Sequence, residues 1–182
     1  DHIVKITLNR PERLNALSGP MLAEVLSAVQ EVEADVSLIE RLFKKRYGRS
    51  PRLLREDFCG TAVLACEWVQ RKPNQRAGGV DLDQETLDWA NQRYIPVLGD
   101  AAERLTLIRD DVLDVHDPKV DVVAGLSFSY SVFKTRDLLR RYFEQVRASL
   151  NPGGILFLDA FGGMEAVSEL NEKRKIDPKT AF

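Results

Sequence analysis

Carboxylate side chains end three of the apolar segments of this chain, at positions where they could bind a nucleoside. The three groups are Glu56 with Asp57, Asp81, and Asp110 with Asp111. A carboxylate at the end of a strand can accept hydrogen bonds from both hydroxyls of a ribose, and we expect this role for Asp81. Asp111 is the candidate for meeting the amino group of an adenine, and an ordinary turn residue is the open alternative for a single aspartate at a strand end. Glu56 and Asp57 are the candidates for binding an ammonium group.

The segment from Glu56 to Ala62 is predicted to be a turn between a strand and a helix. Gly60 suits a tight turn, and a helix start offers unpaired N–H groups to an anion such as a carboxylate. We expect Thr61 to cap that helix. Phe58 and Ala62 stand where the glycines of a GxGxxG fingerprint would let the backbone approach a pyrophosphate, which argues against a dinucleotide.

The two cysteines, Cys59 and Cys66, are not in a CxxC arrangement and have no histidine near them in the sequence. This spacing argues against a zinc site and against a disulfide framework, so no metal is expected. We expect Cys59 to be a small packed residue, because a nucleophilic thiol would need a depressed pKa.

Short apolar runs alternate with amphipathic stretches from Pro51 onward. The predicted strands are residues 52–55, 76–81, 105–109, 120–125 and 155–159. Parallel neighbours need a crossover connection, so the alternation predicts an α/β fold with a Rossmann-like, doubly wound, mainly parallel sheet. Ligands of such sheets lie beyond the carboxyl ends of the strands. Asp83 is predicted to cap the helix that follows the second of these strands.

The part before Pro51 is predicted to hold one strand and two helical segments. The strand is the β-branched run 3–8, and the helical segments cover 21–29 and 38–47. The second helix is expected to end at Gly48, with Lys44, Lys45 and Arg46 in its last turn, where positive charge suits the helix dipole.

The bulk composition is that of an ordinary globular chain. The 26 Lys and Arg against 28 Asp and Glu give a formal charge of −2, so no global basic field favours nucleic acid. No apolar run approaches the roughly 18 residues of a membrane span, and we do not expect the charged opening to be a secretory signal. These features predict a cytoplasmic protein that does not enter a membrane.

Four segments, taken in order and spacing, resemble the class I S-adenosylmethionine-dependent methyltransferase family over about residues 38–170. Residues 53–62 are similar to its first motif, 79–83 to its ribose-binding motif, 108–112 to its adenine-proximal motif, and 150–156 to its turn into the fifth strand. The resemblance implies S-adenosylmethionine as cofactor. The implied cofactor-binding residues are Glu56, Asp57, Phe58, Cys59, Gly60, Thr61, Asp81, Leu82, Asp110, Asp111 and Val112.

The resemblance also implies transfer of a methyl group to an acceptor, with a small molecule as the default. Such enzymes place acceptor contacts after the fourth strand, so Ser127 and Tyr130 are weak candidates, and an ordinary loop remains an open alternative. The sulfonium methyl is already activated, so the protein mainly has to orient the acceptor. No catalytic residue is therefore assigned.

The opening, residues 4–18, resembles the start of the enoyl-CoA hydratase/isomerase (crotonase) family. We expect residues 1–36 to form a crotonase-like strand and helix that acts as a lid or an added sheet edge. Residues 37–182 are expected to form the cofactor-binding domain, without the last strands of its sheet. The crotonase catalytic loops are absent from the sequence, so hydratase activity is not expected. An unprotected sheet edge would favour formation of oligomers.

Two other functions remain open on the sequence alone. One is a non-catalytic adenosyl-ligand-binding or scaffold remnant of a methyltransferase, and the other is a nicotinamide-dependent oxidoreductase. Protein and nucleic-acid acceptors also remain open, although the overall charge gives nucleic acid no support.

Overall fold

Five parallel strands form one sheet whose order reverses next to its first strand. The computed structural model describes residues 21–160, with side chains from residue 32 onward. The strands are β1 (Leu53–Asp57), β2 (Arg76–Asp81), β3 (Leu105–Arg109), β4 (Val120–Gly125) and β5 (Leu150–Leu158). They lie in the order β3-β2-β1-β4-β5, and every pairing is parallel. The predicted doubly wound sheet is thus confirmed, with its switch point between β1 and β4.

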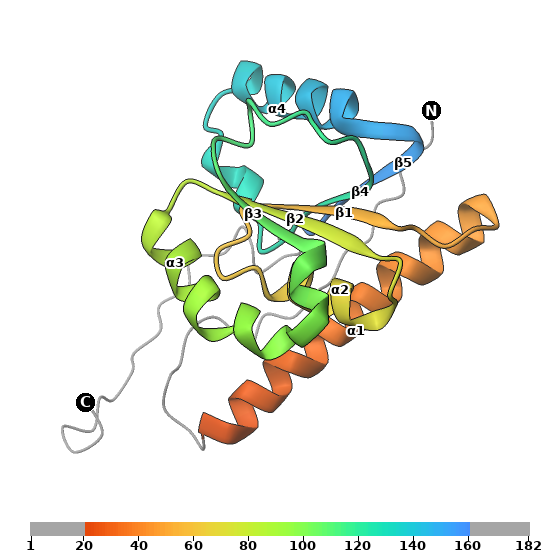
Figure 1. The fold of residues 1–182 in the computed structure, drawn as a ribbon. Coiled ribbons are helices and arrows are strands. Elements are labelled where there is room, and N and C mark those ends of the chain that lie inside the picture. Colours follow the sequence, from red (N-terminus) through yellow and green to blue (C-terminus); the bar gives the residue numbers. More distant parts are fainter. Residues whose placement is uncertain (1–20, 161–182) are drawn as a thin grey trace, which may run out of the picture.

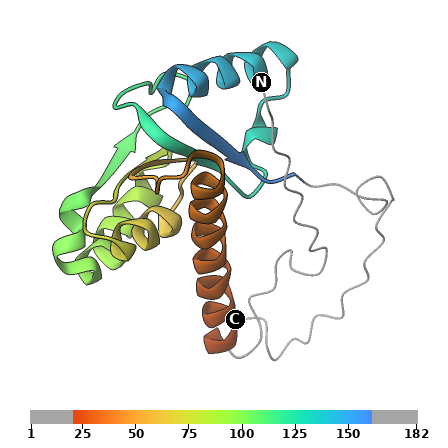
Figure 2. The same cartoon turned by 90° about the vertical axis from the view of Figure 1, so that its right-hand side faces the viewer.

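Helices cover both faces of this sheet. They are α1 (Met21–Tyr47), α2 (Val63–Arg71), α3 (Gln84–Arg93) and α4 (Arg136–Ser149), with the 3-10 segments η1 (Ile95–Arg104) and η2 (Ser129–Val132). Figures 1 and 2 show α1, α2 and α3 on one side of the sheet and α4 on the other. Each strand therefore contributes to two cores: Leu54 and Val122 belong to the first, Val80 and Val123 to the second.

The predicted helical segments 21–29 and 38–47 are one continuous helix, α1. The residues between them include neither glycine nor proline, so nothing in the backbone ends the first segment. Val36, Ile39 and Phe43 recur at helical spacing and are buried against α2 and the sheet. The predicted domain boundary at residue 36 falls inside this helix, whereas the predicted strand 3–8 lies outside the described residues.

Two adjacent glycines of β2 face opposite sides of the sheet and should respond oppositely to substitution. A Cβ at Gly79 would stand 2.9 Å from the Cys59 sulfur and 3.3 Å from the Ala62 Cβ, whereas a Cβ at Gly78 would meet nothing closer than 3.9 Å. We expect Gly79→Ala to lower the free energy of unfolding by about 1–3 kcal/mol through overpacking. Gly78→Ala should raise it by about 0.5–1 kcal/mol. Urea denaturation of both variants measures the difference, and equal shifts would contradict the packing described here.

Candidate functional site

The turn after β1 is hydrogen-bonded to the end of β2 through Asp81. The Gly60 N–H donates to Asp81 Oδ2 at 2.7 Å, and the Asp83 N–H donates to Oδ1 at 3.0 Å. The Cys59 N–H donates to the Val80 carbonyl at 2.9 Å. The structure therefore brings Gly60 and Asp81 together at the carboxyl edge of the sheet, as the sequence predicts.

Glu56, the last but one residue of β1, is half-buried beneath this turn. Its Oε2 accepts a hydrogen bond from the Ala65 N–H at 2.9 Å. Burial, together with a smaller effect of the neighbouring charges of Asp57 and Asp81, raises the pKa of the Glu56 carboxyl from 4.5 to about 8. No basic side chain of the described residues forms an ion pair with Glu56. The position therefore favours a cationic ligand, whose charge would ionise the carboxyl.

The start of α2 differs from the prediction that Thr61 caps it. The helix begins at Val63. Its N-cap residue is Ala62, which has a left-handed backbone (φ 56°) and makes no side-chain hydrogen bond to the helix. Glu56 takes over that role through its bond to the Ala65 N–H. The sequence could not reveal this, because a cap supplied from the preceding strand leaves no local motif.

Cys59 packs against the sheet beneath the turn. Its side chain is 6% exposed. Burial, together with the charges of Glu56 and Asp81, raises the pKa of the Cys59 thiol. The thiol stays protonated, so the predicted packing role is the one that the structure supports.

Asp57 lies apart from the other predicted cofactor residues. Successive side chains of a strand point to opposite faces, so Asp57 faces α4 while Glu56 faces α2. Arg55 holds its carboxylate with two bonds, at 2.7 Å from Nε and 3.1 Å from Nη2, and the Tyr142 hydroxyl donates to it at 3.0 Å. This buried network positions α4 on the sheet, and we no longer assign Asp57 to the ammonium.

The ends of β2 and β3 come together as predicted. The Asp110 N–H donates to the Asp81 carbonyl at 3.2 Å, and Asp111 Oδ1 accepts from the Leu113 N–H at 2.9 Å. The Val112 side chain is buried in the second core. By contrast, Leu82, the residue that follows Asp81 in the chain, is an exposed apolar side chain, 64% accessible.

Among residues 21–160, four residues other than glycine have left-handed backbones, and all of them lie after β1 or β4. They are Phe58, Ala62, Ser127 and Phe128, with φ between 56° and 59°. Such conformations are uncommon outside glycine, and they concentrate at sites where function requires a particular loop shape. These residues flank the switch point, so the strained backbone lies at the edge of the sheet that holds the candidate site. The sequence did not indicate these left-handed positions, because phenylalanine, alanine and serine do not favour positive φ.

The loop after β4 is held by Asp159, a residue that the sequence prediction missed. Its carboxylate accepts from the Ser127 N–H and the Phe128 N–H, each at 2.9 Å. Ser127 is exposed beside the switch point, whereas Tyr130 packs partly into the second core. Of the two predicted acceptor contacts, Ser127 is thus the more accessible.

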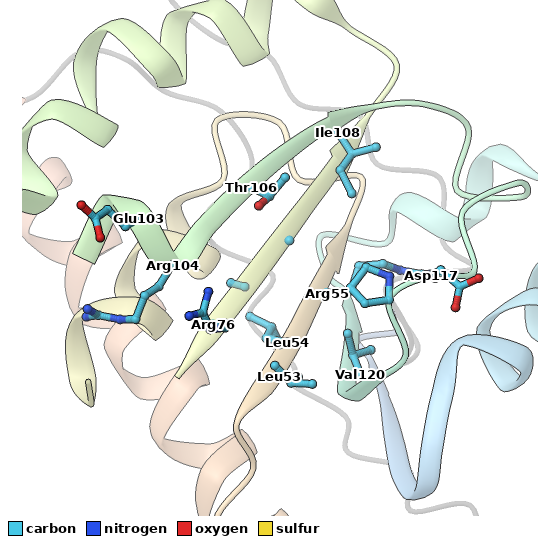
Figure 3. Close-up of a pocket in the computed structure, with 13 residues that line it drawn as sticks. Leu53, Leu54, Arg55, Arg76, Glu103, Arg104, Thr106, Ile108, Asp117 and Val120 are labelled. Carbon is cyan, nitrogen blue, oxygen red and sulfur yellow. The ribbon is translucent and has the colours of Figure 1, made fainter. Parts of the chain in front are cut away.

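A pocket of about 230 Å³ lies elsewhere, on the face of β1, β2 and β3 that α4 leaves open. Figure 3 shows Thr106 and Ile108 of β3 on one flank and Asp117 on the other. The face is open because no helix stands between β3 and β4. None of the predicted cofactor residues lines this pocket, so we do not assign it to the cofactor.

The described residues, 21–160, also bear on two other kinds of site. They contain no cluster of three or more His, Cys, Asp or Glu side chains arranged to hold a metal ion. Within the same residues, no helix has the length and apolar character that crossing a membrane requires.

Comparison with protein families matches residues 59–156 to a methyltransferase domain. The match covers more than half of the chain, so the chain belongs to this methyltransferase family. Residues 1–58 are not part of the match, and the crotonase-like opening stays a prediction. A search of curated proteins finds no match.

Solved structures of methyltransferases share the fold. The sugar N-methyltransferase KedS8 of a Streptoalloteichus species is 18% identical, with a TM-score of 0.64 over 94% of this chain and 64% of its own. CalS10, an amino pentose methyltransferase from Micromonospora echinaspora, is 17% identical, with a TM-score of 0.62 over 84% and 61%. The glycopeptide N-methyltransferase MtfA is 24% identical, with a TM-score of 0.58 over 75% and 54%. The chain thus spans between about half and two thirds of these proteins.

Proposed function

We propose that the chain binds S-adenosylmethionine at the carboxyl ends of β1, β2 and β3 and transfers its methyl group to a small-molecule acceptor. The observation that carries the proposal is the Asp81 carboxylate, bound at 2.7 Å by the Gly60 N–H where two strand ends meet. Glu56 adds a half-buried acid that pairs with no basic side chain among the described residues. Leu82 adds an exposed apolar surface on which a base could lie.

Each of these residues has a separate task in the proposed reaction. Glu56 ionises to bind the ammonium of the cofactor, Asp81 accepts hydrogen bonds from the ribose hydroxyls, and Asp111 meets the adenine. The bound cofactor supplies a methyl group on a sulfonium, which is already activated. The loop that Asp159 holds, with Ser127 exposed, orients the acceptor, because in-line approach is the main remaining requirement.

Several observations support the finer parts of this proposal. Similar solved structures include enzymes named for amino sugars and glycopeptides, which favours a small natural product as acceptor. Cys59 and Cys66 are free thiols, as in proteins of a reducing compartment, and we therefore place the protein in the cytoplasm. Among the described residues β5 pairs only with β4, so its outer edge could join another strand in an oligomer.

Calorimetric titration with S-adenosylmethionine, S-adenosylhomocysteine, NAD and CoA tests the cofactor site. We expect both adenosyl ligands to bind, and Asp81→Asn to weaken them by about 2–3 kcal/mol, about 30- to 150-fold, because one charged acceptor is lost. The matched control is Asp83→Asn, which removes the same charge two residues away and keeps an N-cap residue. Binding of NAD instead, or equal losses in both variants, would contradict the assignment.

A further inference from the structure

A stretch of fifteen residues, 41–55, contains seven basic side chains and no acidic one. The whole chain, by contrast, has a formal charge of −2. The stretch covers the last turns of α1, the turn at Gly48 and most of β1. The stretch enters β1 at the amino end of the strand, whereas the proposed cofactor site lies at the carboxyl ends of the strands. The molecule therefore carries a concentrated positive charge at the edge of the sheet opposite its acidic strand ends.

Six of these seven basic side chains are exposed. They are Arg41, Lys44, Lys45, Arg46, Arg49 and Arg52, and we call them the basic patch. Within the part of the chain that the structure describes, only Arg49 of this set forms an ion pair, with Asp121 at 3.0 Å. The other five therefore keep their charge available for a partner. Figure 1 shows the end of α1, in orange, projecting from the body of the domain beside the start of β1.

A groove between α1 and α2 extends the basic patch. It is about 330 Å³ in volume, and Arg41 and Lys44 line it together with two serines, Glu40 and two further cations, one at the end of α2 and one directly after it. Those two cations, Arg71 and Lys72, are already paired with Glu40. The cations of the groove that form no ion pair with the described residues therefore both belong to α1. They lie along the groove, where an extended anion could contact them.

An aromatic side chain stands among the cations. Tyr47 is 39% exposed, its ring centroid lies 5.0 Å from that of Phe43, and the Arg46 guanidinium lies 6.0 Å from its centroid. A second guanidinium, of Arg49, lies 4.8 Å above the Phe43 ring. A base can stack on such a platform whatever its identity, while the arginines contact the phosphates.

We propose that the basic patch, with Tyr47, binds the backbone of a single-stranded nucleic acid. The chemistry favours this partner over an anionic membrane, because Tyr47 is the only large exposed apolar side chain that the described residues place in the patch. The dipole of α1 accounts for cations in the last helical turn only, and Arg49 and Arg52 lie beyond it. The surface is separate from the methyl-transfer site, so the proposal does not depend on the proposed function.

Fluorescence anisotropy with a labelled oligouridylate of about 20 nucleotides tests this surface at several salt concentrations. The variant combines Arg41→Gln, Lys44→Gln and Lys45→Gln, three positions on one face of α1. The matched control combines Arg136→Gln, Arg140→Gln and Arg147→Gln on α4, which are exposed and remove the same charge. Glutamine keeps the helical preference of the replaced residues, and thermal melts check the fold.

We expect the α1 variant to bind at least about tenfold more weakly than the α4 variant, and its salt dependence to be shallower by about 2 in the log–log slope. Tyr47→Leu should weaken binding about fivefold by removing one stacking partner. If the α1 triple variant does not fold, Arg46→Gln with Arg52→Gln replaces it. Equal binding by the α1 and α4 variants, no binding by the unmodified protein, or binding to phosphatidylserine vesicles in place of the oligonucleotide would overturn the proposal.

Discussion

Replacing Glu56 with glutamine is expected to weaken S-adenosylmethionine binding by about 2–3 kcal/mol and to stabilise the folded protein at alkaline pH. Glutamine can still accept the hydrogen bond from the Ala65 N–H, so the start of α2 keeps its cap. It cannot carry the negative charge that the ammonium of the ligand requires. Titration calorimetry at about pH 7.5, where the ligand keeps its ammonium, measures the first effect, and urea denaturation at pH 9 measures the second.

The pH dependence of this difference follows from the raised pKa of Glu56. Its carboxyl has a pKa of about 8 in the folded chain and 4.5 otherwise, so between these values only the folded chain holds the proton. This group therefore makes the protein less stable as the pH rises from 4.5 to 8, and glutamine avoids the loss. A shift of this size corresponds to about 5 kcal/mol at most, and because the side chain is partly exposed we expect about 1–3 kcal/mol.

The affinity for the ligand should also depend on pH through the proton of Glu56. A cation that ionises Glu56 releases a proton below pH 8, so affinity should rise with pH up to about 8 in the unmodified protein and stay flat in Glu56→Gln. Glu67→Gln is the control, because Glu67 is also half-buried but pairs with Arg71. A gain in alkaline stability without any loss of ligand affinity would show that Glu56 does not touch the cofactor.

Asp57→Ala is expected to lower the free energy of unfolding by about 3–5 kcal/mol, because it leaves the Arg55 guanidinium buried without its counter-charge. Their side chains are 0% and 3% exposed. Arg55 also donates to the Val115 carbonyl and to Ser149 Oγ, so it cannot leave without breaking the contact of α4 with the sheet. Urea denaturation measures the loss.

Three further variants separate charge burial from simple loss of contacts. Tyr142→Phe should cost about 1 kcal/mol, since it removes one hydrogen bond to Asp57. Asp114→Ala should cost less than about 1 kcal/mol, because its pair with Arg141 is more than half exposed. Replacing both Arg55 and Asp57 with methionine and leucine should recover most of the stability. A cost for Asp57→Ala no larger than that for Asp114→Ala would refute a structural role for the buried pair.

The sheet could be predicted from the sequence because its signals are local. Three strands have the predicted bounds: 76–81, 105–109 and 120–125. The Asp83 cap of α3 was also predicted correctly, since a cap next to its helix leaves a sequence pattern. β5 begins at Leu150, not at the predicted residue 155. Asn151 and two glycines indicated a turn there, although Leu150 already pairs with β4. The two 3-10 segments were missed: η1 is broken by the non-helical backbone of Gly99, and η2 has only four residues, so neither produces a regular periodicity.

The geometry of the candidate site departs from the prediction in side-chain direction and in long-range bonds. The pair Glu56 and Asp57 was treated as one acidic group, although the alternation of a strand sends them to opposite faces. The cap from Glu56 to α2 joins residues nine apart, and the bonds of Asp159 join residues more than thirty apart. No pattern in one sequence reports such contacts, because they depend on how the elements pack.

The two bonds from Asp159 to the loop after β4 also restrict how that loop can be exchanged. The backbone that presents Ser127 takes its left-handed turn while both of its N–H groups point at a carboxylate that follows β5. A loop transplanted from a relative would arrive without this anchor unless residue 159 moved with it. Engineering a new acceptor preference into this scaffold therefore means treating the β4 loop and the end of β5 as one exchangeable unit.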